Sequence, residues 1–331
     1  MHVMGERAFT GDQTRSAIDL PTIGLAAGIY LIFGLVTWHA AALPWWLVMA
    51  AGGCLVCLHG SLQHEVVHGF PTRRRWLNVA LIYPSLWLFV PYGLYCDGHL
   101  RHHRDERLTT PDEDPESWYV SAAQWAQMGP FHRRLRQALN TLLGRLVLGP
   151  IYVVCLAVWR LADRAAAGDR AYIAYWIEHI PAVAIVILWV VAVCGLSLGD
   201  YLLLFVYPGL ALTLLRSFAE HRAAVAVAER TAIVESGRIV GLLYLYNNLH
   251  SLHHGEPGTV WLQRPARYRL RQAELLADNG HYRMRGYRVL FARYLLQAKE
   301  PVLHPFDPPP AGLPATIVPA ASLPATDLRA A

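Results

Sequence analysis

The sequence has 331 residues, of which 54% are hydrophobic and only 16% are charged, and its formal net charge is +5. Soluble domains carry about 25% charged residues, so this composition excludes an ordinary soluble domain and is typical of a protein embedded in membrane lipids. Almost all of the basic charge is arginine, and no basic run is interleaved with aromatic residues as a base-stacking platform would be. We therefore expect no nucleic-acid partner.

The first apolar stretch predicts a hairpin of two membrane-spanning helices. Residues 1–20 mix acidic and basic side chains, and we interpret them as a cytoplasmic segment that precedes the membrane. Between Leu20 and His64 there is no Asp, Glu, Lys or Arg, which leaves room for two helices of about 20 residues each. Pro44 lies where a tight turn is needed. We expect helices near 22–40 and 45–67.

A second apolar block, from about residue 171 to residue 215, predicts another hairpin. Its main interruption is Gly199-Asp200, which we interpret as the turn between helices near 173–195 and 200–219. The segments on either side of this block are rich in arginine, whereas the two hairpin turns contain no Arg or Lys. Because positive residues stay on the cytoplasmic side, we expect both termini and both large loops to be cytoplasmic.

The sequence thus predicts an all-α integral membrane protein with four transmembrane helices in two hairpins and a cytoplasmic helical cap. Two further apolar stretches, near 77–95 and 146–159, are broken by prolines or short, and we expect them to be interfacial or re-entrant segments. We place the membrane domain at 21–275 and an amphipathic helical segment with many arginines at 276–300. The Pro- and Ala-rich tail, 301–331, is expected to be disordered.

Three histidine clusters stand out among the sixteen histidines. The first is H-E-V-V-H, the second is H-L-R-H-H and the third is H-S-L-H-H. Helical residues at i, i+3 and i+4 share one face, so each cluster projects two or three imidazoles together. In the predicted topology all three clusters face the same side of the membrane. Their members are His64, His68, His99, His102, His103, His250, His253 and His254.

A ninth histidine, His221, follows the predicted fourth helix and lies at the same membrane face. Nine imidazoles are too many for one ion and suit two ions with four or five ligands each. Imidazole binds iron, copper, nickel and zinc, whereas a structural zinc site is tetrahedral and often contains cysteine. The sequence therefore predicts a two-metal site. Neighbouring polar residues could orient the rings, and the candidates are Asp105, Glu106, Glu220, Asn247 and Asn248.

Two other classes of metal protein remain as alternatives. His64-Glu65-x-x-His68 also matches the zinc-protease signature H-E-x-x-H, with Glu65 as general base. That chemistry needs only one further ligand and leaves the two H-x-x-H-H clusters unexplained. A metal transporter would place its ligands within the spans near the midplane, whereas these histidines lie at span ends and in loops.

The three clusters, in the forms H-E-V-V-H-G, H-L-R-H-H-R-D and N-N-L-H-S-L-H-H, resemble the histidine boxes of the membrane fatty acid desaturase superfamily. The resemblance covers about residues 20–275, and it extends to bacterial members of the superfamily. It implies that the eight box histidines and His221 bind two iron ions, with dioxygen as co-substrate, at the cytoplasmic face of a bacterial inner membrane. The first box has three intervening residues where some members have four.

The same resemblance implies an oxidoreductase that acts on a long acyl lipid or a related apolar substrate, most simply a fatty acid desaturase. A hydroxylase or ketolase acting on a lipid, alkane or carotenoid is the alternative within the superfamily. The sequence has no haem-binding, dinucleotide-binding or iron–sulfur motif, so we expect a separate electron donor such as a ferredoxin. Several aromatic residues could line a substrate tunnel or simply belong to the core, namely Trp87, Phe89, Tyr92, Trp118, Phe205 and Tyr244.

Overall fold

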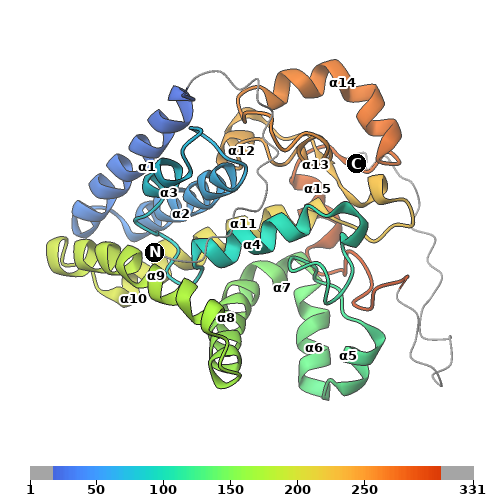
Figure 1. Cartoon of the computed structure of the whole chain (residues 1–331), viewed down its shortest axis with the longest axis horizontal. Coiled ribbons are helices and arrows are strands. Elements are labelled where there is room, and N and C mark those ends of the chain that lie inside the picture. The colour runs from blue at the N-terminus through green and yellow to red at the C-terminus, as the bar shows by residue number, and fades with distance from the viewer. Residues whose placement is uncertain (1–17, 307–331) are drawn as a thin grey trace.

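The computed structural model describes residues 18–306, and this part of the chain is built around four long apolar helices (Figure 1). Each is long and apolar enough to cross a membrane. Most of the remaining described chain forms shorter helices, so the fold is mainly helical, as the sequence predicts. The four membrane-length helices cover Leu20–Trp38, Trp45–Val67, Arg170–Val193 and Leu198–Glu220.

The first hairpin consists of α1 (Leu20–Trp38) and α2 (Trp45–Val67). The carboxylate of Asp19 accepts hydrogen bonds from the backbone N–H and the hydroxyl of Thr22, and so caps the start of α1. A single 3-10 turn, Ala40–Ala42, connects the two helices, and Pro44 precedes the first residue of α2. This short connection makes α1 and α2 antiparallel neighbours.

The second hairpin turns earlier than the sequence suggested. Gly195 adopts a left-handed backbone with φ of 68°, which glycine adopts without strain, and it ends the third span. Ser197 then caps the fourth span by accepting a hydrogen bond from the backbone N–H of Asp200. Asp200 therefore lies in the first turn of the helix, where a negative charge is favourable. The hairpin contains α9 (Arg170–Ile187) with a π-helical end at Leu188–Val193, then α10 (Leu198–Tyr201), a π-helical segment at Leu202–Val206 and α11 (Tyr207–Glu220).

The two inner spans, α2 and α11, pack closely because glycines line their contact. A side chain at Gly52 would place its Cβ 2.6 Å from the backbone oxygen of Leu204, and one at Gly209 would meet Val56 at 2.5 Å. Small residues let helix backbones approach in this way within membranes. This packing brings the end of α2 beside the end of α11, where the first histidine cluster and His221 lie.

The cap is formed by short helices from the two long connections. One connection contributes α4 (Tyr92–His102) and α8 (Gly149–Ala166), and the other contributes α13 (His250–Gly255) and α14 (Arg264–Asp278) (Figure 1). Helices α13 and α14 pack against each other. A small parallel pair of strands joins residues 233–234 to residues 283–284. The cap elements are α3 (Arg75–Leu81), α4 (Tyr92–His102), α5 (Ala122–Gln127), α6 (Pro130–Leu139), α7 (Leu142–Val147), α8 (Gly149–Ala166), β1 (Ile233–Val234), α12 (Arg238–Leu243), α13 (His250–Gly255), α14 (Arg264–Asp278), β2 (Arg283–Met284) and α15 (Arg288–Tyr294).

The structure corrects two expectations for the C-terminal region. Residues 276–300 do not form one amphipathic helix, because Gly280 has φ of 60° and the chain then pairs as β2 with β1. Residues 301–306 are ordered against the cap: the backbone N–H of His304 donates to the carbonyl of Val120. The remainder of the expected disordered tail, 307–331, and residues 1–17 of the expected N-terminal segment lie outside the described residues.

Candidate metal centre

Five histidines from three elements form the first group, which we call the five-histidine group. One ring nitrogen from each lies within 4.8 Å of the corresponding atoms of the others. His68 directly follows the last residue of α2, and His103 directly follows α4. The end of α2 and the end of α4 therefore meet at this point. The members are His64, His68, His99, His103 and His253.

The four remaining histidines of the predicted set form a second group, the four-histidine group. Its ring nitrogens also lie within 4.8 Å of one another. His221 joins it because α11 ends at Glu220 and the extended backbone of His221 turns its ring toward α13. The members are His102, His221, His250 and His254. The structure thus brings together all nine histidines that the sequence singled out.

The two groups adjoin because α4 and α13 each supply both. His99 of α4 and His103, which directly follows α4, belong to the five-histidine group, whereas His102, between them in sequence, belongs to the other. In α13 the pattern is inverted, and only the middle histidine belongs to the five-histidine group. The rings of His103 and His254 stack across the boundary with centroids 4.3 Å apart. Each H-x-x-H-H box therefore contributes histidines to both groups rather than to one.

The arrangement of ring nitrogens fits a cation in each group. The Nε2 atoms of His103 and His253 are 3.0 Å apart, and those of His221 and His250 are 2.9 Å apart. Two ring nitrogens at this separation direct lone pairs at each other unless a proton or a metal ion lies between them. The Nε2 atoms of His64 and His102 are buried without a hydrogen-bond partner among the described residues. Buried ring nitrogens of this kind require a partner, which a metal ion would supply.

Two carboxylates that the sequence analysis missed hold the rings of α4. Oε1 of Glu116 lies 2.7 Å from Nδ1 of His99, and Oδ1 of Asp114 lies 2.8 Å from Nδ1 of His102. A carboxylate on Nδ1 orients an imidazole so that Nε2 faces the metal, and it raises the basicity of the ligand. Both carboxylates come from the irregular loop after α4. No spacing rule relates that loop to the histidine box.

Two of the polar neighbours suggested by the sequence do contact histidines. Oε1 of Glu220 lies 3.2 Å from Nδ1 of His250, and the side-chain amide nitrogen of Asn247 lies 2.8 Å from Nδ1 of His64. Asn248 instead donates to the carbonyl of Val234 and supports the loop before α13. The side chain of Glu106 is exposed, and that of Asp105 lies outside the described part of the chain.

Burial and neighbouring charges set the protonation of the rings. Burial lowers the pKa of His253 well below its ordinary value, and the surrounding histidines lower it further. The pKa of His250 is shifted in the same direction for the same reasons. A neutral imidazole is the form that binds a metal ion. Burial also lowers the pKa of His102, but Glu116 and Asp114 outweigh it and raise this pKa to about 9.

Glu65, the residue that would be the general base of a zinc protease, is engaged elsewhere. Its carboxylate lies 2.8 Å from the guanidinium of Arg264, and both side chains are fully buried. Arg264 also donates to the carbonyl of Leu245 and to the side-chain oxygen of Asn247. A carboxylate held in such a pair supports the position of α14 and of the third histidine box. This geometry argues against the protease alternative.

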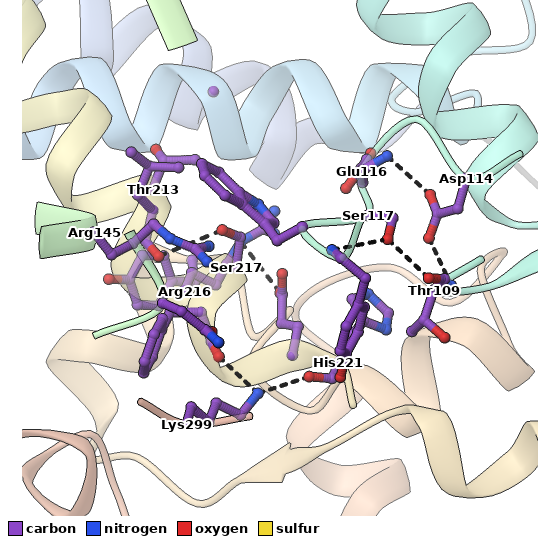
Figure 2. A pocket seen from close by; sticks show the side chains of 18 of the residues that line it. Thr109, Asp114, Glu116, Ser117, Arg145, Thr213, Arg216, Ser217, His221 and Lys299 are labelled. Atoms are coloured by element: carbon purple, nitrogen blue, oxygen red, sulfur yellow. Dashed lines mark hydrogen bonds and ion pairs between the residues drawn. The ribbon is translucent and has the colours of Figure 1, made fainter. Parts of the chain in front are cut away.

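A cavity of about 230 Å³ lies beside the four-histidine group (Figure 2). His221 and Glu220 form part of its wall, so a molecule in the cavity would lie next to the metal centre. Of the aromatic residues considered from the sequence, Trp87, Trp118 and Tyr244 line this cavity. The others, Phe89, Tyr92 and Phe205, pack in the apolar core between the spans.

Comparison with known families identifies the chain. A search of curated proteins finds no match. The model of the fatty acid desaturase family matches residues 23–286, which include nearly all of the first span, the other three spans, the three histidine boxes and His221. This match covers most of the chain, and it agrees with the two histidine groups at the ends of the inner spans. The chain is therefore an oxidoreductase-type membrane protein that belongs to the fatty acid desaturase family.

Proposed function

We propose that the nine histidines bind two iron ions, one in each group, and that the enzyme uses dioxygen to introduce a double bond into a long fatty acyl chain. The observation that carries this proposal is the division of the nine imidazoles into adjoining groups of five and four. Imidazole is a suitable ligand for iron. When bound, the two ions would supply the oxidation of an unreactive C–H bond.

Other residues of the chain would orient the histidine ligands and hold the substrate beside them. Asp114 and Glu116 hold the rings of α4, and the pair of Glu65 with Arg264 holds the loop that carries the third box. The cavity beside His221 would keep the reacting part of the acyl chain close to the four-histidine group. Its aromatic wall would bury apolar surface of the substrate.

The reaction requires an electron donor. Removing two hydrogen atoms from a substrate while reducing dioxygen to two water molecules consumes two further electrons and two protons. The sequence contains no dinucleotide-binding fingerprint and no four-cysteine iron–sulfur motif. We therefore propose a separate electron-transfer protein such as a ferredoxin.

The arginine distribution supports an orientation in the membrane. The long connection between the second and third spans and the region after the fourth span carry most of the arginines. Positive residues near span ends stay on the cytoplasmic side. We propose that the metal centre and both termini face the cytoplasm at a bacterial inner membrane, with the hairpin turns on the far side.

Lipid mass spectrometry tests the reaction and separates it from its alternatives. Lipids from cells that express the protein are compared with lipids from cells that express His102→Ala. A product lacking two hydrogen atoms supports the desaturase. A product that has gained an oxygen atom contradicts desaturation and identifies a hydroxylase or, after further oxidation, a ketolase. Identical lipid profiles with metal uptake into cells would contradict both and favour a transporter.

A further inference from the structure

The cavity beside the metal centre has two unlike ends. Figure 2 shows Glu116 and His221 on one side of the view and Arg145 and Thr213 on the other. The first end belongs to the metal centre, since Glu116 contacts His99 and His221 is a member of the four-histidine group. The opposite end contains a buried arginine that the proposed chemistry does not use.

Arg145 belongs to α7 and is only 3% exposed. Its Nε–H donates to the carbonyl of Leu139 at 2.8 Å, and its guanidinium lies 3.4 Å from the ring centroid of Trp118. The hydrogen bond occupies one of the five N–H donors of the guanidinium. Within residues 18–306 the two Nη groups have no hydrogen-bond acceptor, and Arg145 lines the cavity.

No carboxylate in the described part of the chain lies within ion-pair distance of Arg145. The four carboxylates that line the same cavity have other partners. They are Asp114 with His102, Glu116 with His99, Glu220 with Arg216 and His250, and Glu300 with the backbone N–H of Ala223. A buried cation without an anion is unfavourable.

A charged neighbour of Arg145, Arg136, increases this imbalance. Burial lowers the pKa of Arg145 well below its ordinary value, and nearby Arg136 lowers it further. Lys299 also lies at the cavity wall, but it donates to the carbonyls of Phe218 and His221 and its Nζ lies 3.8 Å from Oε1 of Glu300, so it adds no unpaired charge beside Arg145. This end of the cavity therefore favours an anion.

We propose that the Nη groups of Arg145 bind a carboxylate or phosphate group at the head of an amphiphilic ligand, with the apolar chain of that ligand extending along the cavity toward His221. A guanidinium is well suited to such a group because it can donate two parallel hydrogen bonds to two oxyanion atoms. The inference rests on the proposed function only in treating the ligand as the substrate. It specifies an anionic amphiphile rather than a neutral ester, alcohol or hydrocarbon.

Equilibrium binding of a fluorescent fatty acid tests the proposal without turnover. The full-length, metal-loaded protein in detergent is titrated with cis-parinaric acid and with its methyl ester. We expect the acid to bind at least about tenfold more tightly. Equal affinities would overturn the proposal. The ratio of the two affinities is measured on the wild-type protein. It therefore tests the proposal even if an Arg145 variant fails to fold because it loses the hydrogen bond to Leu139 at the end of α6.

Two variants and two competitors locate the site and identify the head group. Arg145→Gln should remove the preference for the acid, whereas Arg133→Gln, at an arginine that stacks on Trp125 outside the cavity, should retain it. A folded Arg145→Gln variant that keeps the preference would contradict the proposal. Tighter competition by palmitate than by hexadecyl phosphate indicates a carboxylate head group, and the reverse order indicates a phosphate lipid. Competition by hexadecanol as tight as that of either anion contradicts the proposal. Because no product is measured, these results stand even if the lipid analysis rejects desaturation.

Discussion

The carboxylate of Glu65 lies 2.8 Å from the guanidinium of Arg264, and neither side chain is exposed. This ion pair joins α2, which carries the first histidine box, to α14, which follows the third. Arg264 also donates to Asn247, whose amide contacts His64. The pair therefore reaches the five-histidine group through Asn247, which contacts both Arg264 and His64.

Breaking this pair from one side should destabilise the protein. Glu65→Gln or Arg264→Met leaves the other charge buried without its partner, at a cost of about 3–5 kcal/mol. We expect a lower thermal unfolding midpoint in detergent and a lower metal content for each single variant. The double variant should unfold at a higher temperature than either single variant. Equal midpoints for the wild type and both single variants would show that the pair contributes no stability.

Loss of one histidine from the four-histidine group should affect metal content as well as activity. His102→Ala removes an inward-facing Nε2 atom, and we expect no detectable product and a fall from about two to about one iron ion per chain. His132→Ala is the matched control, because His132 is exposed and belongs to neither group. Wild-type activity in His102→Ala would show that His102 is not a ligand of the metal centre.

The carboxylate on His99 should matter for metal affinity rather than for folding. Glu116→Gln keeps the size of the side chain but weakens its interaction with Nδ1, and we expect metal affinity to fall about 10–100-fold in competition with a chelator. Glu113→Gln, in the same loop, changes an exposed residue paired with Arg107 and should leave the affinity unchanged. Similar affinities for the two variants would argue against a role for Glu116 in holding the ring.

Filling the cavity should change which chains are accepted. Thr213 lines the same cavity as Arg145 (Figure 2), so Thr213→Leu would occupy part of its volume. We expect the preferred substrate to become a shorter acyl chain, measured as the ratio of products from a mixture of chain lengths. Thr213→Val, which is similar in size to threonine, controls for loss of the hydroxyl. An unchanged chain-length preference in Thr213→Leu would show that the substrate does not occupy this cavity.

The sequence predicted the parts of the fold and site that depend on local spacing and composition. Long apolar stretches identified the four spans, and the i, i+3, i+4 pattern identified the histidine boxes. His221 was found because the predicted topology placed it at the end of a span. Local spacing did not predict that His102 and His253 each belong to a different histidine group from the other members of their box. This division depends on how α4 and α13 face each other.

The supporting residues were harder to predict. Asp114 and Glu116 lie in a loop whose path depends on positive φ angles at Thr109 and Asp112, which no sequence pattern indicated. The partner of Glu65 is distant in the chain and becomes a neighbour only when α14 docks. Arg145 was one of many arginines in the sequence, and what distinguishes it is burial without a carboxylate partner among the described residues, whereas the buried Arg216, Arg222 and Arg264 each have one. Long-range packing, rather than local propensity, determines these contacts.

The central claim, a two-iron centre formed by nine histidines, is tested most directly by metal analysis of the purified full-length protein. The geometry predicts about two iron ions per chain, as expected for one ion in each histidine group. His68→Ala and His250→Ala, one from each group, should each reduce this content to about one. A single bound zinc ion with no iron would contradict the account.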